Sequence, residues 1–66
     1  MSERGDMIAI LAATIPDAID LKDETALLTY LIEMAHVAEY RPSEVGLAFE
    51  AIVATARALR AERTAA

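Results

Sequence analysis

The stretch at residues 24–40, ETALLTYLIEMAHVAEY, constrains the fold most, because apolar residues cover most of its circumference as a helix. Leu27, Leu31, Met34 and Ala38 follow the three- and four-residue spacing of one helical stripe. The stripe is widened on one side by Leu28, Ile32 and Ala35, and on the other by Tyr30 and Val37. The remaining polar strip consists of Thr29, Glu33, His36 and Tyr40. A helix with so wide an apolar face needs more than one neighbour to cover it.

The length and composition favour a single all-α domain over residues 1–66. Hydrophobic residues make up 56% of the chain and many of them are alanine or leucine, which are strong helix formers. A chain of 66 residues has only a marginal core of its own. It contains no cysteine and one histidine, so disulfides and thiolate metal sites are excluded. Helix packing and oligomerisation remain as the means of stabilisation.

A short first helix is predicted at about residues 6–14, with Ser2 or Asp6 as its cap. Met7, Leu11 and Ile15 form its apolar stripe. Pro16 ends it, because the residue before a proline avoids the helical region. Residues 15–23 then form a packed connection, and Asp20 or Asp23 caps the next helix.

The second and third helices are predicted at about residues 24–41 and 44–63. The Arg41-Pro42-Ser43 sequence separates them, with Pro42 as the breaker and Ser43 as the cap of the third helix. So short a break predicts an antiparallel helical hairpin. The fold class expected is therefore all-α, with a short N-terminal helix followed by the hairpin.

The third helix carries two apolar faces. The face with large residues consists of Val45, Ala48, Phe49, Ile52, Ala56 and Leu59. The opposite face has a heptad-like spacing and consists of Leu47, Ala51, Ala54, Ala58 and Ala61. Small residues allow two helix backbones to approach closely, although alanine is also a good helix former that surfaces tolerate. We expect a homodimeric bundle whose interface contains Leu47, Ala51, Ala54 and Ala58 with Leu28 and Ile32 of the second helix.

The net charge of −5 disfavours nucleic acids and membranes as partners, because both present phosphate groups. Residues 51–66 carry a local excess of arginine, at Arg57, Arg60 and Arg63. These arginines allow a nucleic-acid regulator as a weak alternative, or an ion pair with the acidic segment 17–24 across a subunit interface. They also suit the negative end of the helix dipole on their own. The absence of cysteine and of a basic N-terminal flank favours a cytoplasmic protein.

Glu33 and His36 form a Glu-x-x-His pair, the spacing that places both side chains on one metal in di-iron bundles. Such a site needs further carboxylates from facing helices, and the polar strip places this pair in water instead. The sequence contains no glycine-rich phosphate loop, and no metal or cofactor is expected. The function expected is a small non-enzymatic protein–protein interaction module, a homodimeric adaptor or regulator, with another protein as a further candidate partner. The alternative is a metal or small-ligand bundle that uses Glu33 and His36 across an oligomer.

Overall fold

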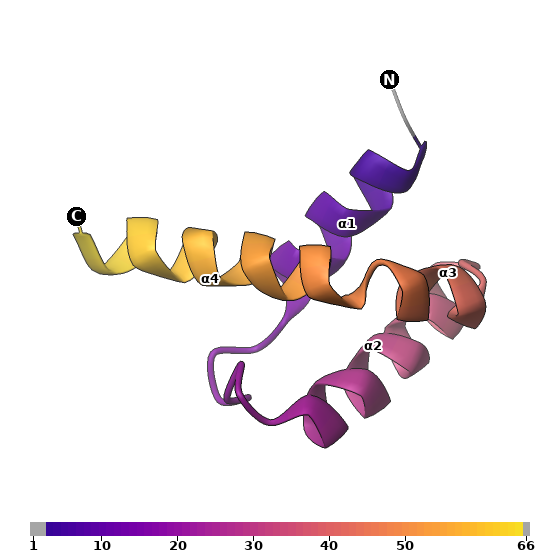
Figure 1. Ribbon diagram of the computed structural model, residues 1–66, viewed down its shortest axis with the longest axis horizontal. Coiled ribbons are helices and arrows are strands. Elements are labelled where there is room, and N and C mark those ends of the chain that lie inside the picture. Colours follow the sequence, from indigo (N-terminus) through magenta and orange to yellow (C-terminus); the bar gives the residue numbers. More distant parts are fainter. Residues whose placement is uncertain (1–2, 66) are drawn as a thin grey trace.

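The computed structural model describes the backbone of residues 3–65 and the side chains of residues 3–64. In this part of the chain the elements are α1 (Glu3–Thr14), α2 (Glu24–Val37), α3 (Pro42–Leu47) and α4 (Phe49–Ala65), and there is no strand (Figure 1). The four helices pack together, so the all-α prediction is confirmed. The first helix begins at Glu3, which is earlier than expected, so Asp6 lies inside it. The predicted cap at Ser2 lies outside the described residues.

The beginning of α2 agrees with the expectation from sequence. The Asp23 carboxylate accepts a hydrogen bond of 3.1 Å from the backbone N–H of Ala26, which satisfies one of the free donors of the first turn. Asp20 serves the connection instead, where its carboxylate accepts from the N–H of Lys22 at 2.9 Å. Of the two predicted caps, Asp23 is therefore the one that caps the helix.

The end of α2 differs from the prediction, because the helix stops at Val37 rather than near residue 41. The N–H of Tyr40 donates to the carbonyl of Ala35 at 2.8 Å, and the N–H of Glu39 donates to the carbonyl of His36 at 3.3 Å. These two bonds form a Schellman motif, in which Glu39 adopts a left-handed conformation with φ of 63°. The chain therefore leaves the helix before it reaches the proline.

Pro42 is the first residue of α3, a position where its missing N–H is not needed. Arg41 stands at the cap position without a side-chain capping bond. The predicted cap at Ser43 is therefore wrong, since this residue lies inside the helix.

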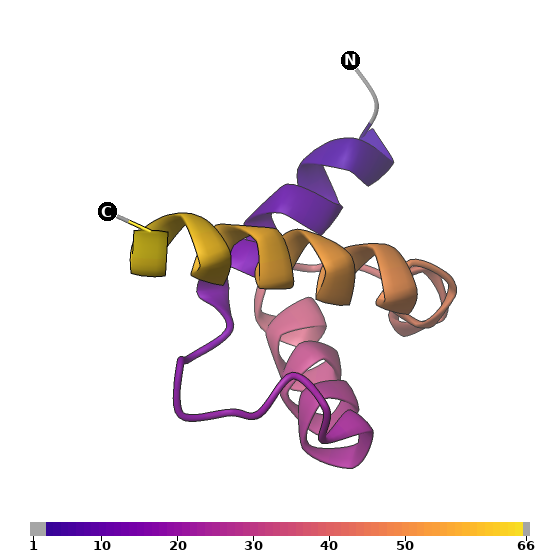
Figure 2. The same ribbon diagram turned by 60° about the vertical axis from the view of Figure 1, so that its left-hand side comes forward.

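The predicted third helix is divided into α3 and α4 by a kink at Ala48. Helical hydrogen bonds continue on both sides of it, from the N–H of Ala48 to Glu44 and from the N–H of Ile52 to Ala48. Ala48 has φ of −94° and ψ of 4°, which turns the helix axis without breaking the chain of bonds. Because of this turn, α2 packs chiefly against α3, whereas α4 packs chiefly against α1 (Figures 1 and 2). The predicted hairpin of two long helices is thus replaced by two contacts. The short helix α3 packs against α2, and α4 crosses α1.

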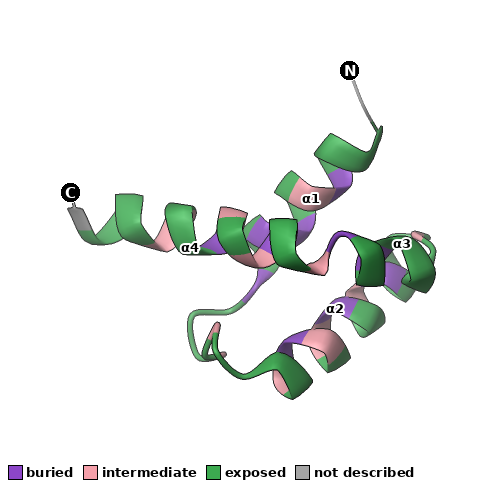
Figure 3. Ribbon diagram, in the orientation of Figure 1, coloured by how far each residue is buried: buried purple, intermediate pink, exposed green. Residues whose placement is uncertain are grey.

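One core joins all four helices. Its fully buried side chains include Leu11 of α1, Leu27 and Leu31 of α2, Val45 of α3 and Ile52 of α4. Val45 and Ile52 are seven residues apart, so they lie on the same side of the chain on either side of the kink at Ala48, and both face this core. Figure 3 shows the buried residues gathered where the helices meet. The large-residue face of the third helix was therefore predicted correctly, although two helices share it.

The chain covers more of its apolar surface than the sequence suggested. Tyr30 and Met34 pack against the core, and so does Tyr40, which was expected on the polar strip. The large hydrophobic side chains that stay exposed among the described residues are Ile10, Ile32, Val37 and Leu47. The molecule is nevertheless flat, with extents of 33 × 29 × 18 Å. It exposes 4608 Å², whereas a compact protein of 7.1 kDa exposes about 4,100 Å².

Candidate interaction surfaces

An apolar groove with an acidic rim lies where α1 approaches the α2–α3 connection and α3. The apolar lining consists of Met7, Ile10, Tyr40 and Leu47, and the charged rim consists of Glu3, Arg4, Asp6 and Glu44. We call this surface the acidic groove; its volume is about 820 Å³. Ile10 is 49% exposed and Leu47 is 78% exposed, so the groove offers apolar side chains directly to solvent. The periodicity of the sequence could not reveal it, because the lining comes from segments that are far apart in the chain.

A second uncovered surface is the alanine face of α4, which we define as Ala51, Ala54 and Ala58. All three residues are exposed, as the two-faced pattern of this helix predicted. Ala54 also borders a smaller hollow, whose lining combines apolar residues with charged ones: Leu21, Phe49 and Val53 with Lys22, Glu24, Glu50 and Arg57. Leu47 belongs to α3, on the other side of the kink, so it lies at the end of this face rather than in line with it.

The other two predicted interface residues, Leu28 and Ile32, lie on α2. Leu28 is half-buried and Ile32 is 39% exposed. These two residues lie on α2, which packs chiefly against α3, whereas the alanine face lies on α4. The structure therefore places the six predicted residues on three helices.

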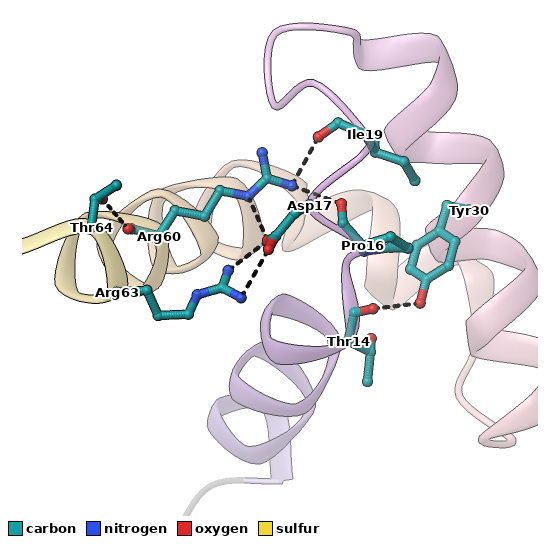
Figure 4. A network of polar contacts seen from close by, with 8 residues as sticks. All are labelled: Thr14, Pro16, Asp17, Ile19, Tyr30, Arg60, Arg63 and Thr64. Atoms are coloured by element: carbon teal, nitrogen blue, oxygen red, sulfur yellow. Dashed lines mark hydrogen bonds and ion pairs between the residues drawn. The ribbon is translucent and has the colours of Figure 1, made fainter. Parts of the chain in front are cut away.

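Two of the three arginines hold the connection between α1 and α2 within the same chain (Figure 4). Arg60 donates to the carbonyls of Pro16 and Ile19, both at 2.8 Å. Arg63 donates to the Asp17 carboxylate at 2.8 and 3.3 Å. These contacts provide a structural role for Arg60 and Arg63 inside one molecule.

Glu33 and His36 both lie exposed on α2, as the polar strip predicted. Within the described residues, no group of three or more histidine, cysteine, aspartate or glutamate side chains comes close enough to hold a metal ion. The pair therefore lacks the additional ligands that a di-iron type of site requires.

No polar or charged side chain of the described residues is buried. The polar contacts between segments lie near the surface, such as the bond of 2.7 Å from the Tyr30 hydroxyl to the Thr14 carbonyl (Figure 4). None of the helices in this part of the chain has the length and hydrophobicity needed to cross a bilayer.

Comparisons with known proteins do not add a family to this description. No family model matches the chain, and searches among curated proteins and solved structures found no match. The surfaces of the molecule are therefore the basis for its functional interpretation.

Proposed function

We propose that the chain is a small non-enzymatic interaction module, a cytoplasmic adaptor or regulator that works as a homodimer. The observation that carries the proposal is the apolar surface left open by the folded chain, above all Leu47 at 78% and Val37 at 77% exposed. Large apolar side chains that a small protein leaves in water gain free energy when a second surface covers them.

The alanine face of α4 supports self-association in particular. An exposed face of small residues allows a second helix to approach closely, and α4 is the longest helix of the molecule. Its partner would be α4 of a second copy, packed about a twofold axis. Leu28 and Ile32 would extend the contact beyond the alanine face, whereas Leu47, the remaining residue of the expected interface, lines the acidic groove.

A stable interface buries about 800 Å² on each partner, which is about a sixth of the 4608 Å² that the chain exposes. The contact would therefore have to extend beyond the three alanines of α4.

Sedimentation velocity of the chain and of two glutamate variants tests the proposal. Ala54→Glu places a charge on the alanine face, and we expect the species of twice 7.1 kDa to dissociate into monomers. Ala9→Glu makes the same change at an exposed site on α1 and serves as the matched control, which should leave the dimer intact. A wild-type chain that sediments as a folded monomer at low micromolar concentration would overturn the homodimer.

A further inference from the structure

We propose that the acidic groove binds a basic amphipathic helix from another protein. The inference rests on the proposed role in protein interaction and names the class of partner. The groove combines two features that such a helix recognises, an apolar floor and a rim of one predominant charge.

The floor supplies the affinity. Met7 is buried in the core and Tyr40 is half-buried against it, whereas Ile10 and Leu47 project into solvent. This arrangement suits two or three apolar side chains of an incoming segment, which would cover Ile10 and Leu47. Covering such side chains is the main source of free energy in helix-in-groove binding.

The rim supplies the charge preference. It carries three carboxylates, of Glu3, Asp6 and Glu44, and one guanidinium, of Arg4, so its net charge is −2. The whole chain carries −5, so the surrounding field has the same sign. Lysine or arginine residues beside the apolar anchors of a partner would meet this rim, and a partner with acidic flanks would be repelled.

A helix fits this groove better than an extended strand. Strand addition needs an exposed sheet edge, and the described residues contain no strand. The recognition elements around the groove are helices and a turn, so side-chain anchors at helical spacing have to provide the contact.

A second copy of the chain is a poor occupant, because its net charge of −5 has the same sign as the rim of the groove, and two of its six basic side chains are already in use. Arg60 and Arg63 of each copy bind Asp17 and the carbonyls of the connection. Residues 1–50 of each copy carry ten acidic and three basic side chains, so the groove of one copy would face a surface of like charge. Charge complementarity therefore points to a different, basic protein.

Fluorescence anisotropy with a labelled synthetic peptide tests the inference on the full chain. The probe is a helix of about 18 residues with leucines at positions i, i+3, i+4 and i+7 and lysines elsewhere. One comparison peptide replaces the lysines with glutamates, and another spreads the leucines around the helix. We expect binding in the micromolar range for the first peptide only, weakened severalfold when the salt is raised to about 0.5 M.

Two pairs of variants locate the binding site. Asp6→Asn with Glu44→Gln neutralises the rim and should weaken binding about fivefold, whereas Glu33→Gln with Glu62→Gln, which changes the net charge equally, should weaken it less than twofold. Ile10→Ser removes an exposed anchor and should weaken binding about tenfold, whereas Val37→Ser, another exposed apolar residue outside the groove, should not. Circular dichroism confirms that each variant is folded.

Equal losses from both charge pairs would show general attraction to an acidic protein and would overturn the inference, as would the absence of binding. A loss of self-association in Ile10→Ser would show that a second copy fills the groove, which also overturns it. A persistent dimer that binds no peptide contradicts this inference and leaves the proposed function standing. A monomer that binds the peptide as described supports the inference and contradicts the homodimer.

Discussion

The three arginines of α4 provide a graded test of how the chain holds its connection in place. Arg60 is the central one, because its guanidinium donates to two carbonyls of the connection and lies near Asp17, at 3.8 Å from Nε to Oδ1. Its side chain is only 25% exposed. Arg63 contacts Asp17 alone and is 60% exposed. Arg57 makes no ion pair with the described residues.

The magnitudes follow from these environments. A hydrogen bond from a charged donor contributes about 1.5–3 kcal/mol when protected, and we take about 1 kcal/mol for each Arg60 bond because water reaches this site. Arg60→Ala should therefore lower the free energy of unfolding by about 2 kcal/mol. Arg63→Ala should lower it by about 0.5 kcal/mol, since exposed ion pairs contribute little. Arg57→Ala should change it by less than about 0.5 kcal/mol.

Urea denaturation followed by circular dichroism measures all three variants. They share the same change of residue on the same helix, so the difference in helix propensity is common to them and largely cancels. For a domain of this size, the Arg60→Ala loss corresponds to a melting temperature lower by about 8–16 °C. If Arg60→Ala is as stable as Arg57→Ala, the tether between α4 and the connection does not stabilise the fold.

Three further predictions concern backbone and core. Glu39→Gly should stabilise the fold by about 0.5–1 kcal/mol in thermal or urea unfolding, because glycine adopts the left-handed conformation at the end of α2 without strain; a loss of stability would contradict the Schellman motif. Gly46→Ala should stabilise by up to about 1 kcal/mol, since a Cβ there meets open space and the glycine has no positive φ. If it instead abolishes self-association while the fold remains stable, Gly46 lies in the interface. Leu31→Ala should destabilise by about 2–5 kcal/mol, and Ile32→Ala, one position further along α2, by much less; equal losses would contradict the assigned face of this helix.

The parts of the fold that were predictable from the sequence depend on local chemistry. Asp23 lies directly before an apolar periodic segment, so its role as a cap follows from its neighbours along the chain. The buried stripe of Leu27 and Leu31 and the large-residue face of the third helix follow from helical spacing in the same way.

The features that were missed depend on tertiary contacts or on unusual backbone. Glutamate is not a residue that signals a left-handed helix end, so Glu39 did not mark the end of α2. The kink at Ala48 separates α3, which packs against α2, from α4, which packs against α1, and alanine gives no local sign of it. An ion pair between these arginines and the acidic segment 17–24 was considered only across a subunit interface, whereas Arg60 and Arg63 meet Asp17 within one chain, more than 40 positions apart, which no spacing rule reveals.

The two candidate surfaces also differ in whether they depend on local sequence or on tertiary contacts. The exposure of Ala51, Ala54 and Ala58 was predictable, because they share one face of a single helix. The acidic groove was not, because Ile10 of α1 and Leu47 of α3 meet only in the folded chain.

Intermolecular nuclear Overhauser effects between isotope-labelled and unlabelled copies test the central claim most directly, since they report which side chains touch a second molecule. The account predicts cross-peaks from the methyl groups of Ala51, Ala54 and Ala58, and none from Leu11 and Ile52 in the core of each copy. A mixed sample that shows no intermolecular cross-peaks and tumbles as a particle of 7.1 kDa would contradict it.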